Sequence, residues 1–368
     1  MSEFSERVLR WQREHGRHGL PWQATRDPYR VWLSEIMLQQ TQVSTVLGYY
    51  ERFLDRFPTV ADLAAAPQAD VLALWSGLGY YARARNLHRC AQAVRDDHGG
   101  RFPSDAAGLA ELPGIGRSTA AAIAAFCFGQ RVAILDGNVK RVLARHLGWE
   151  RDLAQAASER ALWDIATERL PSAPTGPSLH DAMVGYTQGL MDLGAEVCTV
   201  RRPACDACPV RIDCVARISG EPERLPIKTR KLRRGQRAAA LLWLQWRDRV
   251  WLVHRPDGGV WGHLWSLPEF PTAAALEQAV VQWPGTLEWR APFKHVLTHF
   301  DWQLQPLRLD WHGDPGAHHQ AEIDALPAIT GAPRDAPSGP ASGRWVRRDE
   351  LHTLGLPAPI RKLLEESP

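Results

Sequence analysis

Apolar residues recur at helical spacing from Phe4 to about Val215. Short breaks at Gly, Pro and Asp-Pro separate the periodic stretches, as expected where helices end. The clearest stretches are residues 44–57, 69–76, 82–98 and 158–170. This part of the chain is therefore predicted to be all-α.

The periodicity stops at residues 221–237, where seven Arg or Lys stand against two Glu. A basic stretch without apolar periodicity is typical of a linker. Such runs are most often solvated, and contact with phosphates is the alternative. The pattern predicts three parts, namely a helical domain at 1–220, a basic linker at 221–237 and a second domain at 238–368.

The second domain has a strand-like pattern. Residues 238–245 and 249–254 are predicted strands around a turn at Arg247 and Asp248. Residues 312–343 are rich in Pro, Gly, Ala, Asp and His and predict a long loop, and residues 345–364 predict a short strand and a helix. The second domain is therefore predicted to be α+β.

The overall charge says little about partners. The 368 residues carry 44 Lys and Arg against 41 Asp and Glu, a net charge of +3, so attraction to a polyanion must come from local clusters. The chain has no run of eighteen apolar residues, and charged residues interrupt the N-terminal stretch. We expect a cytoplasmic protein without a membrane partner.

Residues 31–42 place one acid, Glu35, inside an apolar stripe. On a helix its neighbours three and four residues away are Val31, Trp32, Leu38 and Gln39. Burial there would raise the pKa of the carboxyl, which suits a proton donor working near neutral pH. The stretch alone favours a plainer interpretation, a half-exposed acid paired with an Arg.

Residues 112–120 join a helical segment to an Ala-rich helix. Gly114 and Gly116 remove side chains from the turn, so the N–H groups of the second helix can face a phosphate. This is a helix-hairpin-helix signature. A hairpin whose glycines only allow close packing is the alternative, and the Pro-Gly-x-Gly sequence favours phosphate binding.

Asp136 directly precedes another periodic helical segment, so it is predicted to be the N-cap of that helix. Taken alone, capping explains it. A carboxylate held by N–H groups nevertheless stays ionised, and beside a reacting sugar it would stabilise an oxocarbenium-like transition state. The two roles are compatible.

Four of the six cysteines follow the spacing Cys198-x6-Cys205-x2-Cys208-x5-Cys214. Four thiolates in so short a span can hold one metal centre. Zinc sites usually contain two Cys-x2-Cys pairs and this stretch has one, so an iron–sulfur cluster is favoured, with structural zinc as the alternative.

These segments together resemble the adenine DNA glycosylase (MutY) family, a branch of the helix-hairpin-helix superfamily that also contains endonuclease III. The resemblance is carried by residues 20–22, 32–42, 77–85, 112–120 and 134–145 and by the four cysteines. It implies an all-α helix-hairpin-helix DNA glycosylase domain with an iron–sulfur loop, followed by an α+β Nudix-like domain. It also implies one [4Fe-4S] cluster and a monomer that acts on double-stranded DNA in a bacterial-type cytoplasm.

The resemblance implies hydrolysis of the bond between sugar and adenine where the adenine is mispaired with 8-oxoguanine or guanine. Glu35 would protonate the adenine, Asp136 would stabilise the sugar cation, and Asn138 would assist near the sugar. Ser118 stands where the endonuclease III branch has a nucleophilic Lys, so monofunctional hydrolysis that leaves an abasic site is expected.

Further DNA contacts follow from the same resemblance. Gln188 would contact the adenine. Gln40, at the end of the helix that carries Glu35, and Tyr80, in a separate loop, would enter the base stack beside 8-oxoguanine. Core packing is the alternative for Tyr80, and its Gly-Leu-Gly-Tyr-Tyr context favours an exposed loop.

Residues 255–262 and 355–364 resemble the Nudix-like module of the family. Thr298 and His299 occupy its reading loop and would contact 8-oxoguanine, with Leu297 in place of an aromatic ring; ordinary strand residues are the alternative. Only Glu277 stands where a Nudix hydrolase carries several metal-binding carboxylates, so pyrophosphate hydrolysis is the least favoured function.

Two other functions stay open at this point. One is a bifunctional glycosylase and lyase of the endonuclease III type, which Ser118 and Glu35 disfavour. The other is a non-catalytic DNA-binding iron–sulfur protein, in which Glu35 is an edge acid and Asp136 only a cap.

Overall fold

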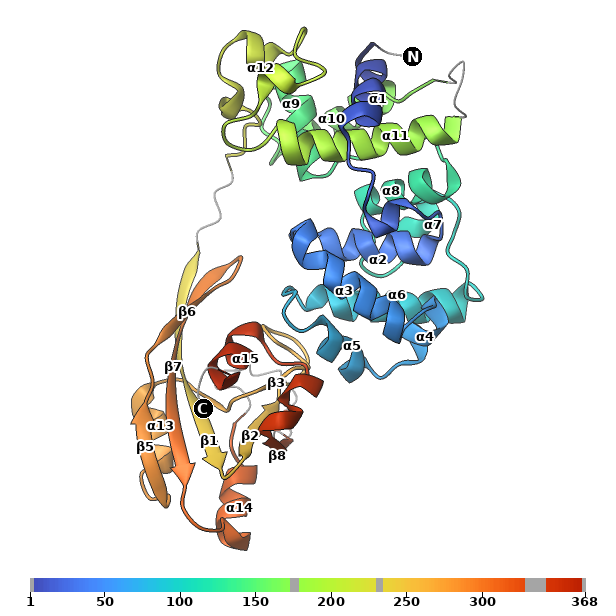
Figure 1. Cartoon of the computed structure of the whole chain (residues 1–368). Coiled ribbons are helices and arrows are strands. Elements are labelled where there is room, and N and C mark those ends of the chain that lie inside the picture. Colours follow the sequence, from blue (N-terminus) through green and yellow to red (C-terminus); the bar gives the residue numbers. More distant parts are fainter. Residues whose placement is uncertain (1–2, 173–178, 230–233, 328–341, 366–368) are drawn as a thin grey trace. The chain divides into compact units, whose positions relative to one another are not determined.

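The computed structural model describes residues 3–172, 179–229, 234–327 and 342–365. Contacts divide the chain into two compact units, one formed by Met1–Ala65 with Asn86–Lys231 and the other by Ala66–Arg85 with Leu232–Pro368 (Figure 1). The described helices include none that is both long and apolar enough to cross a membrane.

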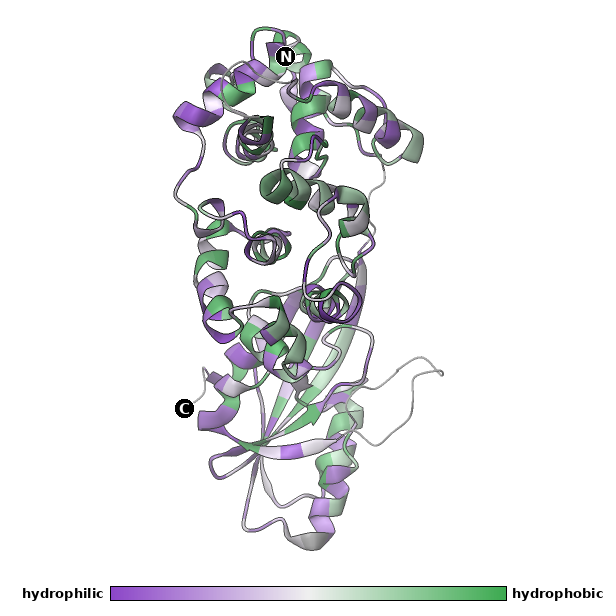
Figure 2. Ribbon diagram, turned by 90° about the vertical axis from the view of Figure 1, so that its right-hand side faces the viewer, coloured by the Kyte–Doolittle hydropathy of each residue, from purple (hydrophilic) through white to green (hydrophobic). Residues whose placement is uncertain are grey.

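The first unit is helical. Its helices are α1 (Glu3–His15), α2 (Pro28–Leu38), α3 (Val43–Arg56), α4 (Val60–Ala65), most of α6 (Ala82–Asp97), α7 (Ala106–Ala110), α8 (Arg117–Phe128), α9 (Gly137–Leu147), α10 (Ala156–Glu168), α11 (Leu179–Asp192) and α12 (Val215–Ile218). Hydrophobic and hydrophilic positions interleave along these ribbons, as expected of amphipathic helices (Figure 2).

Short polar residues and glycines fix where the central helices begin and end. Asp27 accepts a hydrogen bond from the Tyr29 amide at the start of α2, and Asp136 caps α9 in the same way. Gly129 and Gly148 end α8 and α9 in the left-handed conformation. These signals are local, which explains why the sequence predicts the start of α9 at Asp136.

Helix α8 forms the centre of the first unit. Its residues Ala120 to Ala125 are buried, and their small side chains let α2, α7 and α11 pack closely around it. The close packing brings the middle of α2, the start of α8 and α9, and the end of α11 around one cavity.

The second unit is built on a mixed sheet. In the described residues its strands are β1 (Gly235–Trp246), β2 (Arg249–His254), β3 (Trp265–Ser266), β4 (Glu269–Phe270), β5 (Gly285–Trp289), β6 (Phe293–Val296), β7 (Phe300–Trp311) and β8 (Gly343–Arg347). The main order is β3-β2-β1-β7-β5, with β1 and β7 parallel. Helices α13 (Ala273–Val280), α14 (Gly316–Asp324) and α15 (Ala358–Glu365) accompany the sheet. The predicted fold class, a helical domain followed by an α+β domain, is confirmed.

The structure differs from the sequence-based picture in three segments. Helix α14 lies within residues 312–343, so the prediction of a continuous loop was wrong there, although residues 328–341 lie outside the described part. Leu225, within the predicted linker, is buried beside Cys214 and accepts a hydrogen bond from Arg145. Residues 66–85 group with the second unit, because α5 (Gln68–Trp75) and the following loop contact the C-terminal segment.

Candidate active site

A cavity of about 670 Å³ in the first unit gathers five of the residues that the sequence singled out. Its walls come from α2, the starts of α8 and α9, and α11. The five residues are Glu35, Ser118, Asp136, Asn138 and Gln188. Residues separated by up to 153 positions in sequence therefore line one cavity.

Glu35 lies half-buried on α2 and lines the cavity. Among the described residues its carboxyl has no hydrogen-bond or ion-pair partner. Burial, with a smaller contribution from the negative charge of Asp136, raises the pKa of this carboxyl to about 8. Glu35 therefore holds a proton at neutral pH, and the surface-pair interpretation is excluded.

Two hydrogen bonds fix the position of Asp136, one to its own carboxylate and one from the neighbouring residue Leu135. Its Oδ1 accepts from the Val139 amide at 2.8 Å, which confirms the predicted N-cap, and the neighbouring Leu135 amide donates to Ser118 Oγ at 3.1 Å. The start of a helix favours negative charge. The two carboxyl groups of the cavity are thus held in different environments, Glu35 without a bonded partner among the described residues and Asp136 on the amide of a helix start.

Asn138 is oriented by Arg141, a residue that the sequence analysis missed. Asn138 Oδ1 accepts from Arg141 at 2.8 Å, and the same guanidinium donates to the carbonyls of Gly194 and Cys198, each at 2.7 Å. A Cβ on Gly194 would lie 2.6 Å from that of Asn138, so glycine permits this approach. The spacing of three residues between Asn138 and Arg141 on one helix was the available signal.

Gln188 is oriented by a second missed residue, Asp192. The Gln188 amide nitrogen donates to Asp192 Oδ1 at 2.8 Å, and Asp192 is fully buried. Arg17 neutralises that carboxylate, with its Nε 2.6 Å from Oδ1. With its NH2 group engaged, Gln188 has its carbonyl oxygen left to accept a hydrogen bond in the cavity.

Gln40 and Tyr80, the predicted base-stack residues, have the left-handed backbone conformation. Their φ angles are 58° and 49°, which is unusual for residues other than glycine and typical of functional turns. Helix α2 ends at Leu38, so Gln40 lies in the turn beyond the helix and not at its end as predicted. Both side chains are exposed, and for Tyr80 the core-packing alternative is wrong.

The hairpin glycines have different roles. Gly114 has a φ of 79°, and a Cβ there would lie 2.6 Å from the Asn86 side chain, so only glycine fits. Gly116 is the N-cap of α8, and a Cβ there would meet no atom within 4 Å. The start of α8 is therefore open, as an anion-binding helix end requires.

Thr298 and His299 lie exposed at the tip of the hairpin that joins β6 to β7. The Leu297 amide donates to the Phe300 carbonyl at 3.0 Å and closes the turn. The two residues belong to the second unit, as does Tyr80, whereas the cavity belongs to the first. Neither residue lies within a strand, so the alternative of ordinary strand residues is wrong.

Comparison with known proteins gives two matching families. A model described as HhH-GPD superfamily base excision DNA repair protein matches residues 33–168, and a NUDIX domain model matches residues 239–366. The chain is 33% identical over 370 residues to the adenine DNA glycosylase of Buchnera aphidicola subsp. Acyrthosiphon pisum, covering 98% of this chain and 97% of the relative. The chain belongs to the adenine DNA glycosylase family.

Relatives of this glycosylase extend beyond bacteria. The human adenine DNA glycosylase is 30% identical over 429 residues, covering 99% of this chain and 73% of the human protein. The solved structure of a thermostable thymine-DNA glycosylase is 29% identical and superposes with a TM-score of 0.51 over 59% of this chain and 95% of that one. The protein is an enzyme of base excision repair and acts on DNA.

The four predicted metal-binding cysteines of the glycosylase line one small cavity beside α9. Burial, with smaller contributions from the neighbouring cysteines, raises the pKa of the Cys208 thiol to about 12, so a cation is required to keep the group ionised. A single zinc ion would hold thiolates about 3.8 Å apart. In the described residues no three of these sulfurs lie within 4.8 Å of one another, so their positions are not those of ligands gathered on a single ion.

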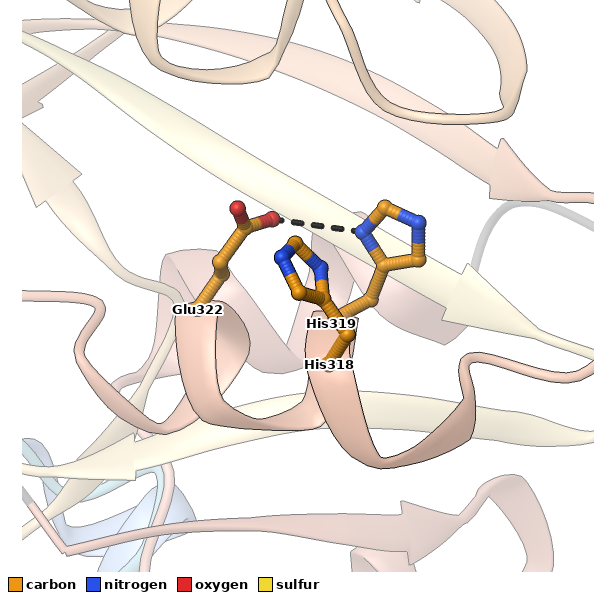
Figure 3. Close-up of side chains that lie close together, drawn as sticks. All are labelled: His318, His319 and Glu322. Carbon is orange, nitrogen blue, oxygen red and sulfur yellow. Dashed lines mark hydrogen bonds and ion pairs between the residues drawn. The ribbon is translucent and has the colours of Figure 1, made fainter.

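A second group of metal-binding side chains lies on α14 of the second unit. His318, His319 and Glu322 offer ligand atoms within 4.8 Å of one another, and His319 faces Glu322 at 3.2 Å (Figure 3). His319 also packs edge-on against Trp311. Two of the three side chains are exposed, and an ordinary surface ion pair accounts for their arrangement.

Proposed function

We propose that this glycosylase hydrolyses the N-glycosidic bond of adenine paired with 8-oxoguanine or guanine in double-stranded DNA and leaves an abasic site. One observation carries the proposal, the meeting of a protonated acid, Glu35, and a helix-capping carboxylate, Asp136, in one cavity. A base buried in a duplex reaches such a cavity only after it flips out of the stack.

The chemistry follows from the two carboxyl groups. Glu35 donates its proton to a ring nitrogen of the flipped adenine, which makes the base a better leaving group. Asp136 then stabilises the positive charge that develops on the sugar as the bond breaks. Water completes the hydrolysis, because Ser118 Oγ accepts a hydrogen bond from Leu135 and provides no amine for a covalent intermediate.

Selectivity for adenine is proposed to come from Gln188. Its nitrogen is engaged by Asp192, so its oxygen accepts from the exocyclic amino group of adenine. Guanine and hypoxanthine present an oxygen at that position and would leave the Gln188 oxygen without a donor, which is costly in a closed site. Asn138, held by Arg141, lies in the same cavity and is proposed to contact the sugar or the attacking water.

The opposite strand is proposed to be read by separate residues. Gln40 and Tyr80 enter the stack where the adenine has left, and Thr298 and His299 contact the 8-oxoguanine. Gly114 and Gly116 shape the helix end that holds a phosphate of the backbone. The protein is proposed to act as a monomer.

Cys198, Cys205, Cys208 and Cys214 are proposed to hold one [4Fe-4S] cluster. When bound, the cluster would shape the loop without taking part in the hydrolysis, since Arg145 and Arg141 connect that loop to α9. The purified protein should be brown and contain about four iron atoms per chain. A colourless preparation that contains zinc would contradict the iron assignment.

The test is single-turnover release of adenine from duplexes that carry adenine opposite 8-oxoguanine, guanine or thymine. We expect release from the first two and none from the third. Strands should break only after treatment with base, because the reaction stops at the abasic site. Strand breakage without base, together with trapping by borohydride, would instead support an endonuclease III-like lyase, and binding without release of adenine would support a non-catalytic protein.

A further inference from the structure

The loop that carries Tyr80 has an unusual backbone conformation. Gly77, Gly79 and Tyr80 have φ angles of 105°, 72° and 49°, and the Tyr80 side chain is 48% exposed. A tyrosine in the left-handed region is strained and persists only where its surroundings hold it. Bonds within the loop hold part of it, among them the one from Trp75 Nε1 to the Gly79 carbonyl at 3.0 Å, and a support from outside the loop adds to them.

The support comes from the C-terminal end of the same unit. The carbonyl of Leu356 accepts two hydrogen bonds from the loop, one from Ser76 Oγ at 2.7 Å and one from the Tyr81 hydroxyl at 2.8 Å. Leu356 is fully buried and Tyr81 is 7% exposed, so the Tyr81 bond is shielded from water, and the Ser76 bond is part-buried. Arg361 of α15 adds a bond of 3.1 Å to Ser76 Oγ.

The supporting segment is itself fixed on its other side. The Gly355 carbonyl accepts from the Trp265 amide of β3 at 2.9 Å, and Arg361 also donates to the Leu354 carbonyl at 2.8 Å. A Cβ on Gly355 would lie 3.3 Å from the backbone of Leu72 in α5, so the segment packs directly against the helix that leads into the loop. Residues 354–361 thus connect the sheet to the Tyr80 loop.

Within the loop, Arg83 lies behind the tyrosine. Its guanidinium is 5.5 Å from the centre of the Tyr80 ring and 5.2 Å from that of Trp75, and it donates to the carbonyls of Leu78 and Gly79. These contacts join the exposed ring to the loop backbone.

We propose that residues 354–361 are a positioning element for Tyr80, so that the Nudix-like part of the chain sets the wedge that keeps the duplex open. The proposal rests on the proposed function, in which Tyr80 fills the space beside the flipped adenine. A side chain that separates stacked bases works only if its own support does not yield, because unstacking opposes it. Ser76, Tyr81 and Arg361 thereby affect extrusion of the base and not the chemistry that follows.

The test uses the full chain with its cluster and removes the two hydroxyl groups as Ser76→Ala, Tyr81→Phe and the double variant. Thr353→Val is the matched control, because that hydroxyl bonds only locally to the Glu350 carbonyl. Single-turnover adenine release is measured on two duplexes. In one the adenine is opposite 8-oxoguanine, and in the other it is opposite an abasic site, where no base pair has to be broken.

The double variant should release adenine about tenfold more slowly opposite 8-oxoguanine and within about twofold of the unmodified protein opposite the abasic site. Tyr80→Ala should give the same split, and Thr353→Val should change neither rate. Equal losses on both duplexes would indicate general damage and overturn the proposal, as would unchanged rates on both. If the unmodified protein releases no adenine from either duplex, the proposed function fails instead.

Discussion

One acid in each unit of this glycosylase, Glu269 in the sheet unit and Glu35 in the helical unit, is shielded from water in whole or in part, and the two acids differ in what surrounds them. In the sheet unit, Glu269 is 6% exposed and pairs with Arg255 at 2.8 Å, so a cation offsets the effect of burial. In the helical unit, Glu35 lines a cavity without a described partner and faces Asp136, another acid. The paired acid supports the fold, whereas the unpaired one keeps a proton that it can donate.

The largest expected effect is on catalysis by Glu35. Glu35→Gln keeps the size of the side chain and removes the acid, so adenine release should fall by about 10²–10⁴-fold, the usual contribution of a general acid. Single-turnover assays on the 8-oxoguanine duplex measure this. Glu51→Gln, on the exposed side of α3, is the control and should behave like the unmodified protein. An unchanged rate in Glu35→Gln would exclude Glu35 as the donor.

The next effect is on stability in the sheet unit. Glu269→Ala removes the carboxylate that pairs with the buried Arg255, which should lower the free energy of unfolding of this unit by about 3–5 kcal/mol. Ten of the sixteen tryptophans lie from Trp243 onward, so urea unfolding followed by tryptophan fluorescence reports mainly on this unit. A change below about 1 kcal/mol would mean that the ion pair is not structural.

Glu35 should have the opposite effect on stability. The unfolded chain releases the Glu35 proton near pH 4.5 and the folded protein near pH 8, so the acid costs stability progressively between these values. Glu35→Gln should therefore be more stable than the unmodified protein by up to about 4 kcal/mol at pH 8. The difference should vanish at pH 4, where both states are protonated. Urea unfolding at the two pH values checks this, and a constant difference would argue against a raised pKa.

The smallest expected effect concerns the orientation of Gln188. Asp192→Asn keeps the shape of the side chain but removes the negative charge that pairs with Arg17. It also weakens the preference of the Gln188 amide for one orientation. Adenine release should slow by about tenfold, since roughly 1.4 kcal/mol of positioning is lost. Discrimination against hypoxanthine should weaken in parallel. Loss of rate without loss of discrimination would mean that Asp192 serves only the fold.

Much of the helical unit follows from local signals. Asp136 before a periodic segment, Gly114 and Gly116 in a turn and Glu35 in an apolar stripe are each visible within a few residues, so they were found from the sequence. The structure adds that Glu35 and Asp136 share one cavity, which local pattern alone does not specify.

The rest depends on contacts between distant residues. Arg17 meets Asp192 across 175 positions, and Leu356 meets Ser76 across 280. Neither pair has a periodic pattern or a spacing that would predict it. The left-handed backbone conformation of Gln40 could not be predicted either, because glutamine rarely adopts it.

The pH dependence of single-turnover adenine release tests the role of Glu35 most directly. If the protonated carboxyl is the donor, the rate should be constant below about pH 7 and fall tenfold per pH unit above a midpoint near 8, where burial and Asp136 place the pKa. The residual activity of Glu35→Gln should lack this transition. A midpoint near 4.5, or a rate that rises through pH 8, would contradict the assignment.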